Sequence, residues 1–409
     1  MYTHKTSCRI CRSENLEAFL DFGKQPLANS FVNAPNPTDE KLYPLVVYFC
    51  HDCNLVQLCD IVGKEELFAN YIYFTSYMPT PKHFIDYAKN VANRFHLSPH
   101  KELVVEIGSN DGLLLSAFVE RGIRVLGVDP AKNIAKIANE RGIPTIADFF
   151  SEKLAGQIDE KEGKAKIIIG NNVFAHIDDI NDVVHGIKEL LDKKGVFILE
   201  APYLVDMFEN LAYDTIYHEH VSYLAIRPLV KLFDKFDLEI FKVELHDAQG
   251  NSIRVFVGHK SEHGIEPSVK KFIEKELSLK MASIGAYKEL AKKIEKTKDD
   301  LLKLLCELKK KGAKIAGYGA PAKGNTLLNY CGIGTNFIDY LTEELPTKIG
   351  QFSPGMHIPV IHIEESRKKP PDYFLMLAWN YKNKILEKEK KYQSEGGKFI
   401  IPIGGIKIV

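Results

Sequence analysis

The sequence has no excess of charge of either sign and no long hydrophobic run. Lys and Arg total 54, and so do Asp and Glu, which makes the formal net charge zero. A surface that binds nucleic acid needs a concentrated excess of Lys and Arg, so this balance argues against a nucleic-acid partner. No apolar run approaches the roughly 18 residues of a membrane-spanning helix, and the residues after Met1 do not resemble a signal peptide. We therefore expect a cytoplasmic protein with no membrane partner.

Cysteine is scarce after the first 60 residues. Five of the seven cysteines come before that point, and four of them form two C-x-x-C pairs, Cys8/Cys11 and Cys50/Cys53. Two such pairs can supply the tetrahedral sulfur set that zinc prefers. A redox C-x-x-C normally opens a helix in a βαβ unit, and neither pair has that setting. We predict one structural zinc ion.

A buried-strand pattern at residues 102–107 runs through a glycine-containing turn into an apolar helix that begins at Leu113. This is the nucleotide-binding arrangement of doubly wound α/β folds. The turn has G-x-x-x-G spacing instead of G-x-G-x-x-G, and it carries acidic residues, which disfavour a diphosphate. An acidic site suits a ligand with an ammonium and a sulfonium group. The pattern therefore favours S-adenosylmethionine over NAD.

The candidate residues for S-adenosylmethionine follow the carboxyl ends of predicted parallel strands, where such folds bind ligands. Asp129 comes about twenty residues after the turn, where a carboxylate can bind the ribose hydroxyls. Asp148 can reach the adenine amine. The full set is Glu106, Gly108, Asn110, Asp111, Gly112, Asp129, Asp148, Asn171 and Asn172.

A second strand and glycine-rich turn begin at residue 314, after a Lys/Glu-rich helical stretch at 266–311. This turn contains a lysine and no acid, so it suits a phosphate or diphosphate. We assign Gly319, Lys323 and Asn325 to substrate binding. Taken alone, the turn is also compatible with an NAD site.

The segment Tyr217–His220 reads Y-H-E-H and lies between these two sites. Histidine has the unperturbed pKa nearest to neutrality, so the segment indicates proton-transfer chemistry, although a solvated polar turn would look the same. In an extended segment His218 and His220 would face the same side, whereas in a turn they would separate. Spacing alone does not choose between them.

The order of seven motifs along the chain resembles that of the sugar-nucleotide C-methyltransferases. The motifs are C-x-x-C…C-x-x-C, E-I-G-S-N-D-G, N-N-V-F-A-H, Y-H-E-H, G-Y-G-A-P-A-K-G-N-T, P-G-M-H-I-P-V and L-A-W-N-Y. The resemblance implies an α/β protein in three parts. These are a zinc-binding domain at 1–66, a central Rossmann-like class I methyltransferase domain at 67–260, and a C-terminal Rossmann-like domain at 261–409 that holds a nucleotide sugar.

The resemblance also implies an activity, C-methylation of a nucleoside-diphosphate keto-sugar with S-adenosylmethionine. It assigns the base to His220, and it places Tyr217, Glu219, His176 and either Tyr71 or Tyr73 in the active site. The stretch 246–252 is longer than the H-G-G-S-like stretch of the family, which affects the sugar pocket. We expect a monomer or a small homo-oligomer.

The chemistry explains why the acceptor should be a keto-sugar. A sugar carbon is nucleophilic only when it lies next to a carbonyl group, where a base can generate an enediolate. Three alternatives stay open at this point. They are O- or N-methylation of the same type of sugar, a nucleic-acid methyltransferase that grips through its zinc ribbon, and a non-enzymatic protein that binds nucleotide sugars.

Overall fold

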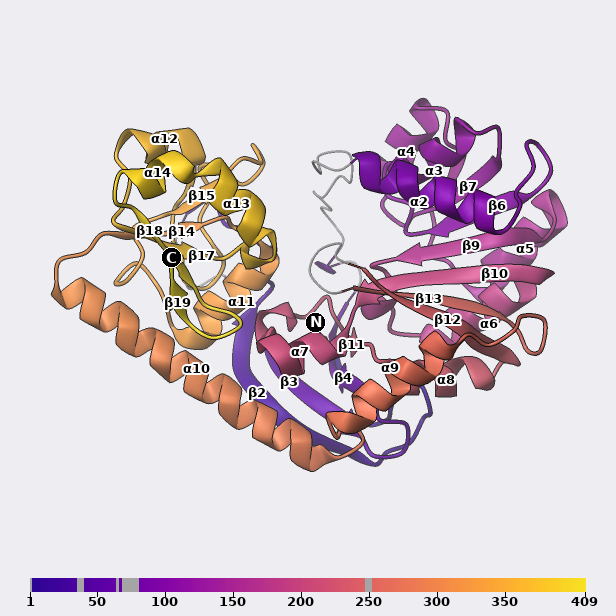
Figure 1. Ribbon diagram of the computed structural model, residues 1–409, viewed down its shortest axis with the longest axis horizontal. Coiled ribbons are helices and arrows are strands. Elements are labelled where there is room, and N and C mark those ends of the chain that lie inside the picture. The colour runs from indigo at the N-terminus through magenta and orange to yellow at the C-terminus, as the bar shows by residue number, and fades with distance from the viewer. Residues whose placement is uncertain (1, 35–39, 64–65, 68–80, 247–251) are drawn as a thin grey trace.

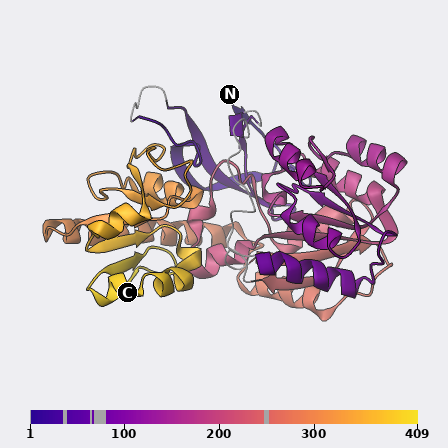
Figure 2. The same cartoon turned by 90° about the horizontal axis from the view of Figure 1, so that it is seen from above.

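The computed structural model describes the whole chain except residues 1, 35–39, 64–65, 68–80 and 247–251. Tyr71 and Tyr73 therefore lie outside the described residues, as does most of the stretch 246–252. Two α/β lobes stand apart at the top of Figure 1 and are joined below by the N-terminal strands and a long helix. Figure 2 shows the indigo N-terminal strands between the two lobes and to one side of them.

The N-terminal region forms a four-stranded antiparallel sheet in the order β11-β4-β3-β2, and its edge strand comes from the middle of the chain. Alternate residues of β3, including Leu45, Val47 and Phe49, are buried in its core. The short strands β1 and β5 pair separately. The bounds are β1 (Tyr2–His4), β2 (Leu16–Pro26), β3 (Leu42–Cys50), β4 (Val56–Leu58), β5 (Asp60–Val62) and β11 (Ser222–Tyr223).

The central lobe contains a seven-stranded sheet in the order β12-β13-β10-β9-β6-β7-β8, in which β13 runs antiparallel to both neighbours. The chain works outward in one direction from β6 to β8 and then returns to β9 on the other side. In such sheets, ligands bind at the carboxyl ends of the strands where this reversal occurs. The bounds are β6 (Leu103–Ile107), β7 (Arg124–Val128), β8 (Thr145–Ile146), β9 (Ala165–Asn171), β10 (Leu191–Pro202), β12 (Leu238–His246) and β13 (Ser252–His259).

Helices cover both faces of the central sheet, so its strands are apolar on both sides. Val104 and Ile167 face the core that α2 and α3 share, whereas Val105 and Ile168 face the core of α5, α6 and α8. The helices are α2 (Pro81–Arg94), α3 (Leu113–Val119), α4 (Lys132–Glu140), α5 (Glu152–Glu162), α6 (Ile180–Leu190), α7 (Leu204–Asn210) and α8 (Ile226–Asp234), with the 3₁₀ turns η2 (Phe174–His176) and η3 (Tyr213–Thr215).

The predicted helical stretch forms α9 (Pro267–Ser278) and the 27-residue α10 (Ile284–Lys310). The apolar stripe of α10 is buried, and its Tyr287 ring packs 4.9 Å from the ring of Phe49 in the N-terminal sheet. The helix then continues to the C-terminal lobe (Figure 1). None of the helices in the described ranges is long and apolar enough to cross a membrane.

The C-terminal lobe has a six-stranded sheet in the order β16-β15-β14-β17-β18-β19, parallel except for β19. Its strands are β14 (Ile315–Tyr318), β15 (Leu341–Glu343), β16 (Val360–His362), β17 (Tyr373–Met376), β18 (Lys398–Ile401) and β19 (Lys407–Ile408). Its helices are α11 (Ala322–Cys331), α12 (Ile363–Lys368), α13 (Lys382–Lys388) and α14 (Lys390–Ser394), with the 3₁₀ turn η4 (Trp379–Tyr381).

Candidate active site

The turn after β6 passes through three left-handed backbone positions. Their φ angles are 69° at Gly108, 50° at Asn110 and 78° at Gly112. Glycine adopts this region without steric cost, and Asn tolerates it better than most residues. A Cβ atom on Gly108 would lie 2.2 Å from the Val173 Cγ1 atom, and one on Gly112 would lie 2.9 Å from the Ile143 Cγ2 atom. Both glycines are therefore required by conformation and by space.

Three carboxylates surround this turn, and all are buried: Glu106, Asp111 and Asp129. Asp129 accepts hydrogen bonds from the backbone amides of Asn110 and Ala131, both at 2.9 Å. Burial first, and then the charges of Asp129 and Asp111, raise the pKa of Glu106 well above its usual range. Within the described residues, Glu106 Oε2 and Asp111 Oδ1 are buried without a hydrogen-bond partner.

Buried carboxylates of this kind are costly unless a cation or a donor meets them. Asp111 Oδ2 already pairs with Arg141 Nη1 at 2.8 Å, whereas Asp111 Oδ1 and Glu106 Oε2 have no partner in the described part of the chain. The ammonium and sulfonium groups of S-adenosylmethionine carry the charge that suits these two oxygens, so the residues present fit this ligand. They do not fit a diphosphate, which would add negative charge to the same pocket.

The remaining residues predicted to bind S-adenosylmethionine lie at the same edge of the sheet. Asn171 ends β9, and its Oδ1 accepts a hydrogen bond from the Tyr87 hydroxyl at 3.4 Å. Asn172 follows in a left-handed conformation (φ 54°), with its Oδ1 buried and unpaired in the described part of the chain. Asp148 lies after β8 and is exposed, and its Oδ1 accepts from the Phe149 amide at 2.7 Å.

The four cysteines of the two C-x-x-C pairs come together. The Sγ atoms of Cys8 and Cys53 are 3.4 Å apart and those of Cys11 and Cys50 are 3.6 Å apart, and all four lie within 4.8 Å of one another. Tetrahedral zinc with Zn–S bonds of about 2.3 Å holds its sulfurs about 3.8 Å apart, so the group fits zinc with little adjustment. Four protein thiolates complete the coordination, which is typical of a structural site.

The Y-H-E-H segment is a turn between η3 and β11, in which the His220 amide donates to the Tyr217 carbonyl at 2.8 Å. The side-chain Nδ1 of His220 lies 2.8 Å from the Thr215 carbonyl oxygen. A carbonyl can only accept, so Nδ1 carries the hydrogen and Nε2 is the basic atom of the neutral ring. The Tyr217 hydroxyl donates to that Nε2 at 2.7 Å.

A second histidine ring stands beside this pair. The ring centroids of His176, on η2, and His220 are 4.8 Å apart. Burial lowers the pKa of His176 to about 4. Burial, followed by the proximity of His176, lowers the pKa of His220 well below its usual range. Both rings are therefore neutral near pH 7, as a general base must be before it accepts a proton.

Because the segment is a turn, His218 and His220 point in different directions. Their spacing in the sequence alone could not decide this. His218 is 1% exposed, and its Nε2 contacts the carbonyl oxygens of Tyr43 and Pro44 on β3 at 3.3 and 3.2 Å. It therefore points into the N-terminal sheet, away from His220. Glu219 accepts a hydrogen bond from Asn29 Nδ2 at 2.8 Å, and burial raises the pKa of this carboxyl.

The second glycine-rich turn, in the C-terminal lobe, reaches the same region. Gly319 has φ 86°, and Lys323 lies in the first turn of α11. The Lys323 Nζ atom is 4.7 Å from the centre of the Trp379 ring, and the Trp379 indole donates to Asp214 Oδ2 at 2.6 Å. The Lys323 charge is among the influences that lower the pKa of His220. Asn325 is buried and donates its amide to the Ala28 carbonyl at 2.7 Å, so that donor is already engaged by the N-terminal region.

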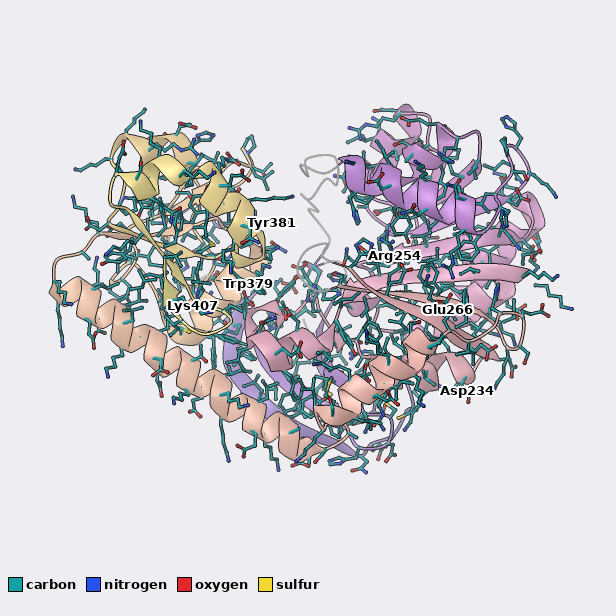
Figure 3. The ribbon with its side chains drawn as sticks, in the orientation of Figure 1. Asp234, Arg254, Glu266, Trp379, Tyr381 and Lys407 are labelled. Atoms are coloured by element: carbon teal, nitrogen blue, oxygen red, sulfur yellow. The ribbon has the colours of Figure 1, made fainter. Side chains whose placement is uncertain are left out.

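Sequence reasoning did not find several residues that contribute to this region. Trp379 and Asp214 connect the C-terminal lobe to η3, just before the Y-H-E-H turn. In the central lobe, Arg254 on β13 forms a buried 2.7 Å ion pair with Glu200 on β10. Figure 3 shows Trp379 and Arg254 on the sides of the two lobes that face each other. The L-A-W-N-Y motif was the only sequence signal for Trp379, and no local pattern connects Glu200 to an arginine 54 residues later.

Zinc removal should unfold the N-terminal sheet, because structural zinc contributes folding free energy directly. We expect Cys50→Ser to lose the metal and to lower the melting temperature by about 10 °C or more. Cys59→Ser is the matched control, since Cys59 is also a buried early cysteine but lies outside the four-thiol group. Metal analysis and calorimetry test this. If the zinc content of Cys50→Ser is unchanged, the predicted zinc site is wrong.

Gly108→Ala should weaken S-adenosylmethionine binding by about tenfold or more, because the added Cβ meets Val173 and the positive φ is strained. Gly142→Ala is the control: Gly142 has φ 80°, but a Cβ there would meet nothing within 4 Å. Titration calorimetry of both variants, with S-adenosylmethionine and with NAD, makes the comparison. Tight NAD binding that Asp129→Ala abolishes would contradict the assignment.

Comparison with known proteins agrees with this geometry. A zinc binding domain model matches residues 8–68, a methyltransferase domain model matches 82–243, and a C-methyltransferase C-terminal domain model matches 247–404. The C-methyltransferase NovU of Streptomyces niveus is 36% identical over 405 residues, which cover 98% of this chain and 96% of that protein.

Two solved structures illustrate more distant similarity. The plantazolicin methyltransferase BpumL in complex with SAH is 11% identical, with a TM-score of 0.36 over 44% of this chain and 86% of its own. An S-adenosylmethionine-dependent methyltransferase from Clostridium acetobutylicum ATCC 824 is 13% identical, with a TM-score of 0.36 over 48% of this chain and 96% of its own.

The family models cover the cysteine group, the acidic turn and the C-terminal lobe in the order in which the chain presents them. The identity to NovU extends over nearly the whole length of both proteins. The predicted fold class, S-adenosylmethionine and zinc are thereby confirmed, while the domain boundaries stay a prediction. The chain belongs to the C-methyltransferase family that its motif order indicated, and it is an S-adenosylmethionine-dependent methyltransferase.

Proposed function

We propose that this enzyme methylates the carbon next to the carbonyl group of a nucleoside-diphosphate keto-deoxysugar. The observation that carries the proposal is the neutral His220 ring, whose Nε2 is held as the basic atom by the Thr215 carbonyl. Oxygen and nitrogen acceptors already have a lone pair, so a carbon acceptor has the greatest need for a base. The name of the relative NovU, a C-methyltransferase, supports the same reaction class.

In this mechanism His220 Nε2 removes the proton from the carbon next to the carbonyl group, and the electron pair moves into an enediolate. S-adenosylmethionine held at the Gly108–Gly112 turn would supply an electrophilic methyl group. The enediolate carbon would take that methyl group as the methyl–sulfur bond breaks, which restores the ketone and releases S-adenosylhomocysteine as the neutral thioether. A positioned base and a donor to the developing oxyanion each contribute about two to four orders of magnitude in rate.

Either Tyr217 or His176 is the donor to the enediolate oxygen. The Tyr217 hydroxyl donates to His220 Nε2 and would turn to the oxyanion once that nitrogen takes the proton. The neutral His176 ring lies 4.8 Å from the His220 ring, measured between centroids, and its Nδ1 is buried without a hydrogen-bond partner among the described residues. Glu219 would orient the turn or accept from a sugar hydroxyl.

The nucleotide end of the substrate would bind at the C-terminal lobe. Lys323 lies in the first turn of α11, where the helix N-terminus and the ammonium group both favour a phosphate. A second cation, Lys348, is buried and donates to the Ala320 carbonyl at 2.8 Å, which stabilises the turn. Its charge also opposes the raised pKa of Glu219, so this turn and the Y-H-E-H segment adjoin each other.

The role of His220 can be tested by hydrogen–deuterium exchange at the reacting carbon, without a methyl donor. His220→Asn should lose exchange and methylation by about 100-fold or more, because the other imidazole of the turn, His218, is engaged by the N-terminal sheet. His218→Asn should keep both, since the Nε2 of His218 contacts the Tyr43 and Pro44 carbonyls of the N-terminal sheet. A mass-spectrometric screen of nucleoside-diphosphate 4-keto-6-deoxyhexoses identifies the substrate to use in this exchange assay. If exchange survives in His220→Asn, the general base is Tyr217 or His176 instead.

The low pKa of His220 predicts how kcat/KM depends on pH. The base stays neutral until the pH falls well below 6.5, so kcat/KM should be flat near neutrality and decline only at acid pH. Lys323 disfavours the imidazolium, so Lys323→Met should raise the pKa of His220 and move the acid decline to higher pH. Lys309→Met, which removes an ammonium group paired with Asp339, is the control. An acid decline that stays in place in Lys323→Met would contradict this account.

A further inference from the structure

Arg9 stands between the two cysteines of the first C-x-x-C pair, yet its side chain is 1% exposed. Its Nη1 donates to Gln57 Oε1 at 3.1 Å and to the Val221 carbonyl, and its Nη2 donates to the Leu58 carbonyl at 2.9 Å. A buried guanidinium is costly unless its donors are satisfied. Both Nη atoms of Arg9 are engaged, and its Nε is buried without a partner among the described residues, so the side chain is held by its two Nη groups.

The partners of Arg9 adjoin the two histidines of the active site. Val221 directly follows His220, and its carbonyl also accepts from the Leu58 amide at 3.0 Å. Asp178 comes two residues after His176, and its Oδ1 lies 3.6 Å from Arg9 Nη2. One guanidinium therefore contacts both chain segments that carry the facing imidazole rings.

The C-x-x-C turn itself is fastened to the same part of the central lobe. The Arg9 carbonyl accepts a hydrogen bond from Asn181 Nδ2 at the start of α6. The Ile10 carbonyl accepts from Lys235 Nζ at 2.6 Å, and Lys5 Nζ lies 2.7 Å from Asp178 Oδ2. The cysteine turn thus has a defined position relative to η2 and to the Y-H-E-H turn.

We propose that Arg9 is a positioning residue that sets the relative placement of His220 and His176. It acts through the Val221 carbonyl and the Asp178 carboxylate and does not touch the substrate. The cysteine turn that carries Arg9 thereby becomes part of the catalytic arrangement as well as of the N-terminal fold. This inference rests on the proposed roles of the two histidines.

The test compares Arg9→Met with Arg12→Met. Arg12 lies directly after the same cysteine pair and pairs with Asp179 at 3.0 Å, but both side chains are more than half exposed, so its loss should leave the histidines in place. We expect Arg9→Met to keep one zinc and to bind S-adenosylmethionine. Its kcat should fall by about 100-fold, as for an ångström-scale misplacement, with little change in KM. Arg12→Met should have native kinetics.

Histidine NMR gives a readout that does not depend on the substrate. With ¹⁵N-labelled histidine, and with His220→Asn and His176→Asn to assign the signals, native His220 should show a hydrogen on Nδ1. In Arg9→Met the His220 and His176 signals should shift or split, and in Arg12→Met they should not. Asp178→Asn changes a partly exposed side chain, so it should fold and give a smaller shift of the same two signals. If Arg9→Met fails to fold, the Asp178→Asn variant alone tests the proposal.

Two results would overturn the proposal: native histidine signals in both Arg9→Met and Asp178→Asn, or a native kcat in a zinc-loaded Arg9→Met. A native enzyme that methylates none of the keto-sugars would contradict the proposed function instead. The NMR comparison would still decide whether Arg9 positions the rings.

Discussion

The structure depends on the pairing of β11 with β4, which attaches the middle of the chain to the N-terminal sheet. Ser222 pairs with Gln57 and Tyr223 with Val56, directly after the Y-H-E-H turn. The turn is thereby held at both ends, since η3 before it is fixed to the C-terminal lobe through the Trp379 indole. A turn fixed on both sides can keep His220 in one tautomer and one orientation, which a solvent-exposed loop could not do.

The electrostatics of the site follow from this arrangement. The acidic turn after β6 is suited to a cationic ligand, and the lysine-containing turn of the C-terminal lobe is suited to an anionic one. The histidines lie between them in a buried region, where both rings are neutral because burial disfavours their charged forms. The zero net charge of the whole chain is therefore compatible with an acidic turn in one lobe and a lysine-containing turn in the other. Each turn can therefore attract a ligand of the opposite charge.

The sequence was most informative where the chemistry is local in the chain. The cysteine pairs, the turn at 108–112 and the Lys323 turn could be predicted because each lies within a few consecutive residues whose spacing has a physical meaning. The partners of the Y-H-E-H turn could not, because Asn29 and Arg9 reach Glu219 and Val221 across 190 and 212 residues. Periodicity also could not separate His218 from His220. The answer depends on the segment being a turn, and the pairing of β11 with a distant strand determines where that turn lies.

The zinc region also bears on the placement of the Y-H-E-H turn. The N-terminal sheet is small, and its strands β4 and β11 contain only three and two residues, too few to be rigid by themselves. Four thiolates around one ion fix the two C-x-x-C turns. Zinc binding thereby supplies folding free energy that a hydrophobic core of this size could not supply by itself. Through Arg9 the first C-x-x-C turn contacts the carbonyl of Val221, one residue after His220, and the carboxylate of Asp178, two residues after His176. In this protein the zinc region and the two segments that carry His176 and His220 are therefore joined by the same contacts.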